Sequence, residues 1–139
     1  MDLAEKVVNK MMDGDSFSKW LGIKVLEISK GYCQLQMQVR KEMTNGFFIA
    51  HGGICYSLAD SALAFAANSD GTQSLSIETS ITYKKKVNNG DILTATAKEI
   101  TKEEKTAIYH IKIENQDNIE VGKFEGKVFR TNKEWFPNN

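Results

Sequence analysis

The segment HGGICYSLAD, residues 51–60, contains the residue types from which a hydrolytic site can be built. His51 and the pair Gly52-Gly53 precede an apolar run, and Asp60 is the single charge within it. The first backbone N–H groups of a helix have no intrahelical partner and lie at the positive end of the helix dipole, so they can stabilise an oxyanion. A carboxylate on an apolar helix is paired, solvated or functional. These residues predict either a tight turn followed by a buried ion pair, or a site that polarises a carbonyl and activates water.

The spacing of the two groups limits how they can act together. Asp60 follows Gly52 by eight residues, which corresponds to a rise of about 12 Å in a helix. A substrate carbonyl held within about 3 Å of one group is therefore out of reach of the other group in the same chain. If both act on one substrate, we expect them to come from different subunits. If Asp60 is structural, we expect backbone donors or a lysine to satisfy it.

Two other chemistries are weakly supported by the motifs. His51 could form a metal site with Cys55 and Asp60, since residues four apart share a helix face. However, the other histidine, His110, falls on a predicted strand, and the chain contains neither a CxxC pair nor an HExxH motif. The serines of the apolar run do not stand in a GxSxG elbow, which disfavours a serine hydrolase.

The apolar run itself predicts one long buried helix. Of the 14 residues from 54 to 67, 11 are apolar and five are alanine, the best helix former. A helix that is apolar nearly all round is buried. Residues 68–71, Asn-Ser-Asp-Gly, suit its end. At about 21 Å, such a helix is too short to span a membrane.

The rest of the chain predicts a short helix and a set of strands. Residues 3–12 have helical apolar spacing, and residues 23–40 predict a hairpin because apolar and polar residues alternate strictly through its second half. Three or four strands are expected after the long helix, at 75–83, 92–100, 106–115 and 119–130. Their connections are short, so we expect sequence neighbours to be antiparallel. Only a curled sheet would cover the helix on most sides, which predicts an α+β fold with five or six antiparallel strands around one central helix.

Composition narrows the function classes. The chain has 18 basic and 18 acidic residues, so no net field would attract nucleic acid or a membrane. The N-terminus lacks the features of a signal peptide. We therefore expect a cytoplasmic protein with Cys33 and Cys55 reduced, folded as a single domain over residues 1–139.

The run N-G-x4-H-G-G-x-x-x-S-L-A-D-x-A-x-A-x-A-x-N-S, from Asn45 to Ser69, resembles the signature of the PaaI-type hotdog-fold acyl-CoA thioesterases of phenylacetic acid degradation. The likeness continues through GDILTATA, IKIENQ and FEGKVFR and covers about Trp20 to Arg130. A hotdog fold is a sheet wrapped around a central helix, as expected above. The resemblance implies hydrolysis of acyl-CoA to a free acid and coenzyme A, with no metal or redox cofactor. It also implies a homodimer with shared sites, often paired into a homotetramer.

The resemblance also implies roles for individual residues. The Gly52 N–H would polarise the thioester carbonyl, and Asp60 of the facing subunit would attack it or activate the attacking water. Asn45 and His51 would orient the carbonyl and the loop before the helix. Ser76 matches a serine that holds the water or the substrate near the aspartate.

Coenzyme A would lie along a basic segment. In this family the nucleotide end of coenzyme A contacts positions that match Gly53, Tyr83 and the run Lys84-Lys85-Lys86. Lys102 and Lys105 follow in the next turn. Three adjacent ammonium groups suit a pyrophosphate and a ribose phosphate. Taken alone, a lysine run is usually a solvated face.

The acyl group is the least determined part. An Arg-Pro often stands where this chain has Lys85-Lys86, and the loop after Asn45 is usually less bulky than Phe47-Phe48. We expect an arylacetyl group, phenylacetyl or a ring-hydroxylated form, which could stack on aromatic side chains near the site: Phe47, Phe48, Tyr56 and Phe65. The alternatives are a short- or medium-chain thioesterase, a hotdog hydratase or dehydratase, and a non-catalytic acyl-CoA-binding protein.

Overall fold

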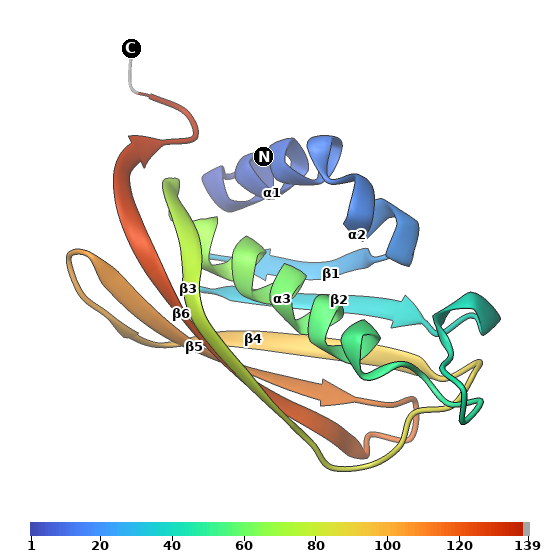
Figure 1. Ribbon diagram of the computed structural model, residues 1–139. Coiled ribbons are helices and arrows are strands. Elements are labelled where there is room, and N and C mark those ends of the chain that lie inside the picture. Colours follow the sequence, from blue (N-terminus) through green and yellow to red (C-terminus); the bar gives the residue numbers. More distant parts are fainter. Residues whose placement is uncertain (138–139) are drawn as a thin grey trace.

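Helix α3, Gly52–Asn68, is the centre of the computed structural model, which describes residues 1–137. The sheet curls around one side of this helix and two short helices cover another side (Figure 1). The predicted helix is confirmed and is two residues longer at its start, because His51 caps it. The last two residues of the predicted domain, 138 and 139, lie outside the described residues.

Among the described residues, six strands form one antiparallel sheet in the order β1-β2-β4-β5-β6-β3. The strands are β1 (Lys24–Ser29), β2 (Tyr32–Gln38), β3 (Thr72–Tyr83), β4 (Ile92–Lys102), β5 (Thr106–Glu114) and β6 (Glu120–Glu134). The predicted hairpin is confirmed as β1 and β2, with Cys33, Leu35 and Met37 buried against α3. Strand β3 therefore lies at one edge of the sheet and β1 at the other.

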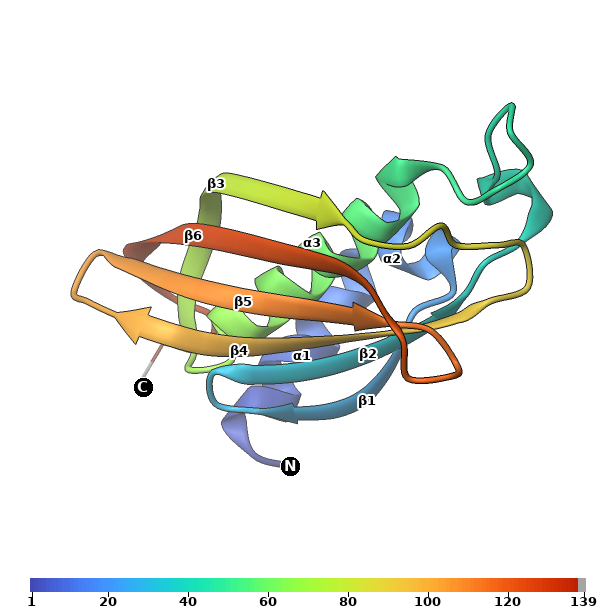
Figure 2. The ribbon, with the colours of Figure 1, turned by 90° about the horizontal axis from the view of Figure 1, so that it is seen from below.

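The expectation that sequence neighbours pair is wrong for β3 and β4. Strand β3 pairs with β6, and β4 pairs with β2. The segment 84–91 that joins them passes the N-terminal end of α3 (Figure 2), where the Ala50 N–H donates to the Val87 carbonyl at 2.7 Å. A short connection can cross in this way because the curled sheet brings its two halves to opposite sides of one helix.

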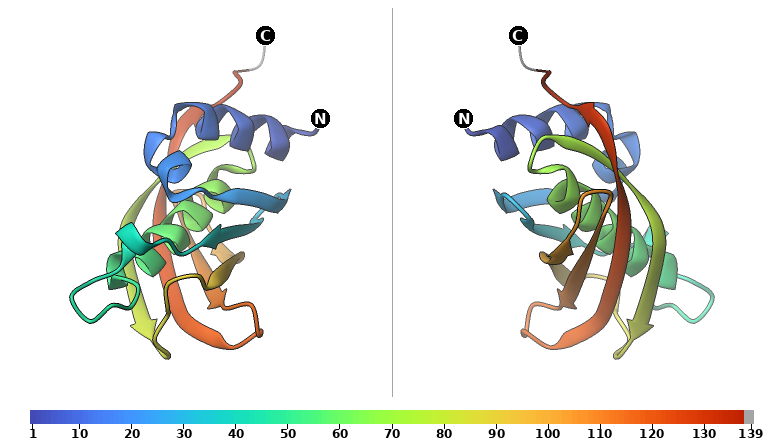
Figure 3. Two further views of the ribbon diagram at one scale, coloured as in Figure 1. Left: turned by 90° about the vertical axis from the view of Figure 1, so that its right-hand side faces the viewer. Right: turned by 90° about the vertical axis from the view of Figure 1, so that its left-hand side faces the viewer.

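Two helices precede the sheet where one was predicted. Helix α1, Leu3–Gly14, begins at Asp2, whose carboxylate accepts the Glu5 N–H at 2.9 Å. Helix α2, Ser16–Leu21, was not predicted. Both lie over a side of α3 that the sheet does not cover (Figure 3). The Ser18 and Ser61 hydroxyls, 2.8 Å apart, join α2 to α3.

The sheet packs very closely on the helix. A Cβ atom at Gly126 of β6 would lie 2.4 Å from Cδ2 of the fully buried Leu63, so only glycine allows this approach. None of the helices within residues 1–137 has the length and apolar character needed to cross a membrane.

Candidate active site

The N-terminal turn of α3 presents a free backbone donor at Gly52. His51 is the N-cap, and its Nδ1 atom accepts the Gly53 N–H at 2.9 Å. The His51 carbonyl accepts the Ile54 N–H at 2.9 Å. Within the described part of the chain, the Gly52 N–H has no hydrogen-bond acceptor. The helix start therefore offers the Gly52 N–H, with the positive end of the helix dipole behind it, to an incoming oxygen.

This donor borders a cavity of about 360 Å³. The cavity is formed by the loop before α3, the first turns of α3 and the segment after β3: Asn45, Ile49, Ala50, Gly52, Cys55, Tyr83, Lys84, Lys85, Lys86 and Val87. The crossing of the segment 84–91 past the helix start is what brings the lysine run beside Gly52. Lys84 pairs with Glu120, whereas Lys85 and Lys86 form no ion pair within residues 1–137. The cavity thus lies between the free Gly52 N–H and two lysines that have no ion-pair partner among the described residues.

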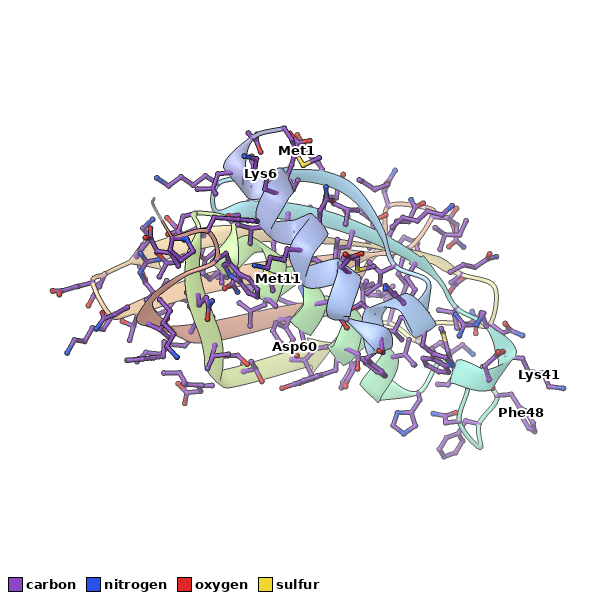
Figure 4. All side chains as sticks on the ribbon, turned by 90° about the horizontal axis from the view of Figure 1, so that it is seen from above. Met1, Lys6, Met11, Lys41, Phe48 and Asp60 are labelled. Carbon is purple, nitrogen blue, oxygen red and sulfur yellow. The ribbon has the colours of Figure 1, made fainter. Side chains whose placement is uncertain are left out.

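Asn45 holds the loop that forms one wall of the cavity. Its Oδ1 atom accepts the N–H groups of Phe47 at 2.9 Å and Ile49 at 3.4 Å. This turn presents the rings of Phe47 and Phe48 to solvent, with 83% and 85% of their surface exposed. The loop projects beyond the N-terminal end of α3 (Figure 2), and Figure 4 places Phe48 at its tip. The Asn45 Nδ2 group forms no hydrogen bond in the described structure and lies at the cavity, where it can donate to a ligand.

Asp60 lies on the open face of α3, between the N-terminal helices and β3 (Figure 4). It belongs to a partly exposed stripe of the helix that also includes Gly53, Tyr56, Ser57 and Ala64. The Asp60 carboxylate forms no hydrogen bond or ion pair with any other described residue. Partial burial raises its pKa above that of an ordinary aspartate. A half-buried, unpaired carboxylate is the state expected of a functional group and differs from the paired structural state that was the alternative.

Comparison with known proteins bears on this geometry. The family model described as the Thioesterase superfamily matches residues 47–121, a stretch that contains Gly52, Asp60 and the lysine run. The chain belongs to the thioesterase superfamily.

Individual thioesterase-superfamily proteins match over most of their length. The Escherichia coli protein named acyl-coenzyme A thioesterase PaaI is 37% identical over 86% of this chain and 86% of its own. The solved structure of E. coli PaaI, from the phenylacetic acid degradation operon, superposes with a TM-score of 0.92 at 34% identity, covering 94% of this chain and 95% of that one. An Archaeoglobus fulgidus protein is 39% identical over 97% of this chain and 88% of its own. The PaaI resemblance and the hotdog fold are confirmed.

The thioesterase fold does not bring every predicted site residue into this cavity. Lys102 forms an ion pair with Asp70 at 3.1 Å, beyond the opposite end of α3 from Gly52. Lys105 lies in the β4–β5 turn at that same end, where its carbonyl accepts the Arg130 N–H at 2.7 Å. The lysine cluster at the cavity of one chain is therefore the run that follows Tyr83.

Ser76 also lies away from the cavity of its own chain. It is exposed on β3, whose outer edge pairs with no other described strand, and it is opposite Val128 of β6. A contact between Ser76 and a ligand at the Gly52 turn thus needs a second subunit, as does a contact between Asp60 and that ligand.

Two of the four predicted aromatic side chains belong to the core of this thioesterase. Phe65 is fully buried. Tyr56 packs edge-on against Phe124 with ring centroids 5.1 Å apart, and its hydroxyl is hydrogen-bonded to that of Thr79. Phe47 and Phe48 remain available to a ligand.

The sequence did not predict four residues of the cavity: Ile49, Ala50, Cys55 and Val87. Val87 carried a signal, because it is the one apolar residue in the polar segment KKKVNNGD. Its burial and its backbone bond to Ala50 anchor that segment at the helix start. Burial raises the pKa of the Cys55 thiol to about 11, so at neutral pH this side chain is a neutral thiol and not a nucleophilic thiolate.

Proposed function

We propose that this protein hydrolyses acyl-CoA thioesters to a free acid and coenzyme A. The observation that carries the proposal is the unpartnered Gly52 N–H at the start of α3, beside a lysine-lined cavity, in a chain whose helix also holds the unpaired Asp60. The relative PaaI is named an acyl-CoA thioesterase. A Streptococcus mutans protein whose structure was solved with acetyl-CoA, at 25% identity and a TM-score of 0.78, supports a coenzyme A ester as the ligand.

In this reaction the two groups divide the work. The Gly52 N–H donates a hydrogen bond to the thioester oxygen and stabilises the negative charge that develops on it. Asp60 either attacks the carbonyl carbon, forming an anhydride that water hydrolyses, or removes a proton from the attacking water. In both routes the C–S bond breaks, the thiolate leaves as coenzyme A and takes up a proton, and water supplies the hydroxyl of the acid. His51 fixes the helix start through its bond to Gly53, and the Asn45 Nδ2 group donates to the carbonyl.

The site is shared between two chains in this proposal. Asp60 follows Gly52 by eight positions in α3. This corresponds to a distance of about 12 Å along the helix, which no single thioester carbonyl bridges. The edge strand β3 supplies a surface for pairing, because Leu75 and Ile77 are 67% and 58% exposed there. Two copies that meet along β3 and the open face of α3 would place Asp60 and Ser76 of one chain at the Gly52 turn of the other. Further pairing of such homodimers into a homotetramer is part of the same proposal.

Coenzyme A and the acyl group would occupy different walls of the cavity. Lys85 and Lys86, together with Lys84, offer positive charge to the phosphates. For the acyl group we favour arylacetyl, since Phe47 and Phe48 are exposed on the loop between two residues that line the cavity, Asn45 and Ile49. Aromatic stacking adds about 0.5–1.5 kcal/mol beyond burial, so we expect at most about a tenfold preference over a straight chain.

Thiol release from acyl-CoA esters tests the function. We expect wild-type protein to hydrolyse phenylacetyl-CoA, and Asp60→Asn and Asp60→Ala to lose at least about a hundredfold in kcat. Near-normal turnover by both variants would contradict the mechanism. Tight binding of acyl-CoA without hydrolysis of any ester would indicate a binding protein, and hydration of an enoyl-CoA would indicate a hydratase. A tenfold higher kcat/KM for hexanoyl-CoA would overturn the aryl preference alone.

A further inference from the structure

The hydroxyl of Tyr83 makes a contact that substrate binding does not explain. Tyr83 is the last residue of β3, and its Oη atom donates to the Gly52 carbonyl at 2.9 Å. A carbonyl oxygen has two lone pairs, so the Gly52 oxygen can accept this bond besides its helical one. The bond therefore joins the first turn of α3 to the strand from which the lysine run continues.

The packing around Gly52 is set by the same hydroxyl. A Cβ atom at Gly52 would lie 3.0 Å from the Tyr83 Oη atom and 3.2 Å from Cζ. This separation is tighter than an ordinary van der Waals contact, so an added methyl group would push the ring or the helix turn away. The backbone of Gly52 and the Tyr83 hydroxyl are thus fitted to each other.

Tyr83 is not a core residue that is there to fill space, because 54% of its surface is exposed. Partial burial, with the neighbouring Cys55 and Tyr56, raises the pKa of its phenol, so the hydroxyl stays a donor throughout the neutral range. Its partner belongs to the residue whose N–H is the free donor of the site.

We propose that Tyr83 is a positioning residue: its hydroxyl holds the first turn of α3 so that the Gly52 N–H stays aimed at the thioester oxygen while Lys84–Lys86 stay at a fixed separation from it. This role rests on the proposed thioesterase function. Tyr83 acts through Gly52 and not on the reacting atoms.

The test uses Tyr83→Phe, which keeps the ring and removes the hydrogen bond. We expect kcat to fall about three- to tenfold while KM changes less than about twofold, because a bond that orients an oxyanion donor acts chiefly on the transition state. Tyr109→Phe is the matched control. It also loses a hydroxyl hydrogen bond, to Glu99 at 3.2 Å, but on β5 away from the cavity, and its kcat should stay at the wild-type value.

A double-mutant cycle with Gly52→Ala separates positioning from a general loss of structure. If the hydroxyl acts through Gly52, Tyr83→Phe should cost much less in the Gly52→Ala background, where the added methyl group already displaces it. Equal cost in both backgrounds, unchanged kcat, or a rise in KM alone would overturn the proposal.

Amide hydrogen exchange gives a readout that does not depend on activity. In Tyr83→Phe the Gly53 N–H, whose peptide group contains the Gly52 carbonyl, should exchange about three- to tenfold faster than in wild type or Tyr109→Phe. Unchanged exchange would refute the positioning role. A wild-type protein inactive on every thioester would refute the proposed function instead, and the exchange rates would still decide whether Tyr83 holds this turn.

Discussion

Replacing Gly52 with proline should remove the proposed oxyanion donor while α3 still begins at residue 52. Gly52 is the first residue of α3, the helix position where proline is best tolerated. The preceding His51 has φ −60° and ψ 137°, extended values that a residue before proline adopts readily. The missing N–H breaks no hydrogen bond of the described chain, since the Gly52 N–H has no acceptor there. The proline ring would occupy part of the cavity that this donor borders.

The matched control is Gly52→Ala, which keeps the N–H. Both substitutions add a Cβ atom 3.0 Å from the Tyr83 hydroxyl, so their difference reflects the lost N–H and the proline ring and not the contact with Tyr83. Loss of one oxyanion donor costs about 100- to 1000-fold in kcat, or about 2.7–4 kcal/mol of transition-state stabilisation. We therefore expect kcat of Gly52→Pro to fall about 100-fold or more below that of Gly52→Ala.

Saturating phenylacetyl-CoA with spectrophotometric detection of the released thiol gives kcat for both proteins. Thermal melting should place both variants within a few degrees of each other, which confirms that a folded protein is assayed. A proline variant within about threefold of the alanine variant would show that the Gly52 N–H does not bind the transition state, and the oxyanion assignment would be wrong.

Four further outcomes follow from the same structure. Mixing Gly52→Pro with Asp60→Asn under subunit exchange should restore about a quarter of wild-type activity, since half of the dimers are mixed and each has one intact site; recovery no greater than the sum of the parents would refute shared sites. Because burial raises the Asp60 pKa, kcat/KM should fall with acidity at a pH above the ordinary aspartate value of about 3.9. For the same reason Asp60→Asn should raise the Tm at neutral pH, and the gain should vanish as pH falls below that ordinary value. Asp70→Asn should lower the free energy of unfolding by about 3 kcal/mol at pH 7, because it leaves the mostly buried Arg130 without its carboxylate partner.

Replacing Asp70 should change stability in the opposite direction to replacing Asp60, for a physical reason. Burial alone would raise the Asp70 pKa, but hydrogen bonds from Arg130 at 2.8 Å, from the Thr72 N–H at 3.0 Å and from Lys102 at 3.1 Å outweigh it and lower the pKa. The ionised form therefore stabilises the fold above the ordinary aspartate pKa. That stability is lost as pH falls through the lowered pKa, so urea unfolding of wild type and Asp70→Asn should converge in acid.

The sequence predicted the central helix and the β1–β2 hairpin because both depend on local periodicity. The alanine-rich run and the strict alternation through β2 are visible within windows of 7 to 14 residues. Helix α2 was not predicted because it has only six residues, although its two cap residues, Asp15 and Gly22, are visible in the sequence. Short helices carry too few periodic positions to stand out from a loop.

Pairing of β3 with β6 could not be read from connection lengths. Which strands become neighbours depends on how far the sheet curls around α3. That curl depends on the fit of Gly126 to Leu63 across the core. Contacts of this kind join residues far apart in sequence, so local pattern carries no information about them. Lys102 shows the same limit: nearness along the chain to the lysine run does not bring it to the same end of α3 within one chain.

The candidate site at the start of α3 could be proposed from the sequence because its parts occur together in one motif. Asn45, His51 and Gly52 lie within eight consecutive residues, and the geometry of a helix N-terminus decides what they can do. The hydrogen bond from Tyr83 to Gly52 depends on tertiary packing, and no local sequence pattern indicates it.

Two aspartates ten residues apart show how the structure separates stability from chemistry. Asp70 is surrounded by two cations and a backbone donor, and its pKa is lowered. Asp60 has none of these among the described residues, and its pKa is raised. A protein under selection for stability alone would gain by replacing Asp60 with an apolar residue, as in the rest of α3. An unpaired Asp60 on the open face of the helix, with no partner among residues 1–137, is what we expect of a carboxylate that completes the site of a second subunit.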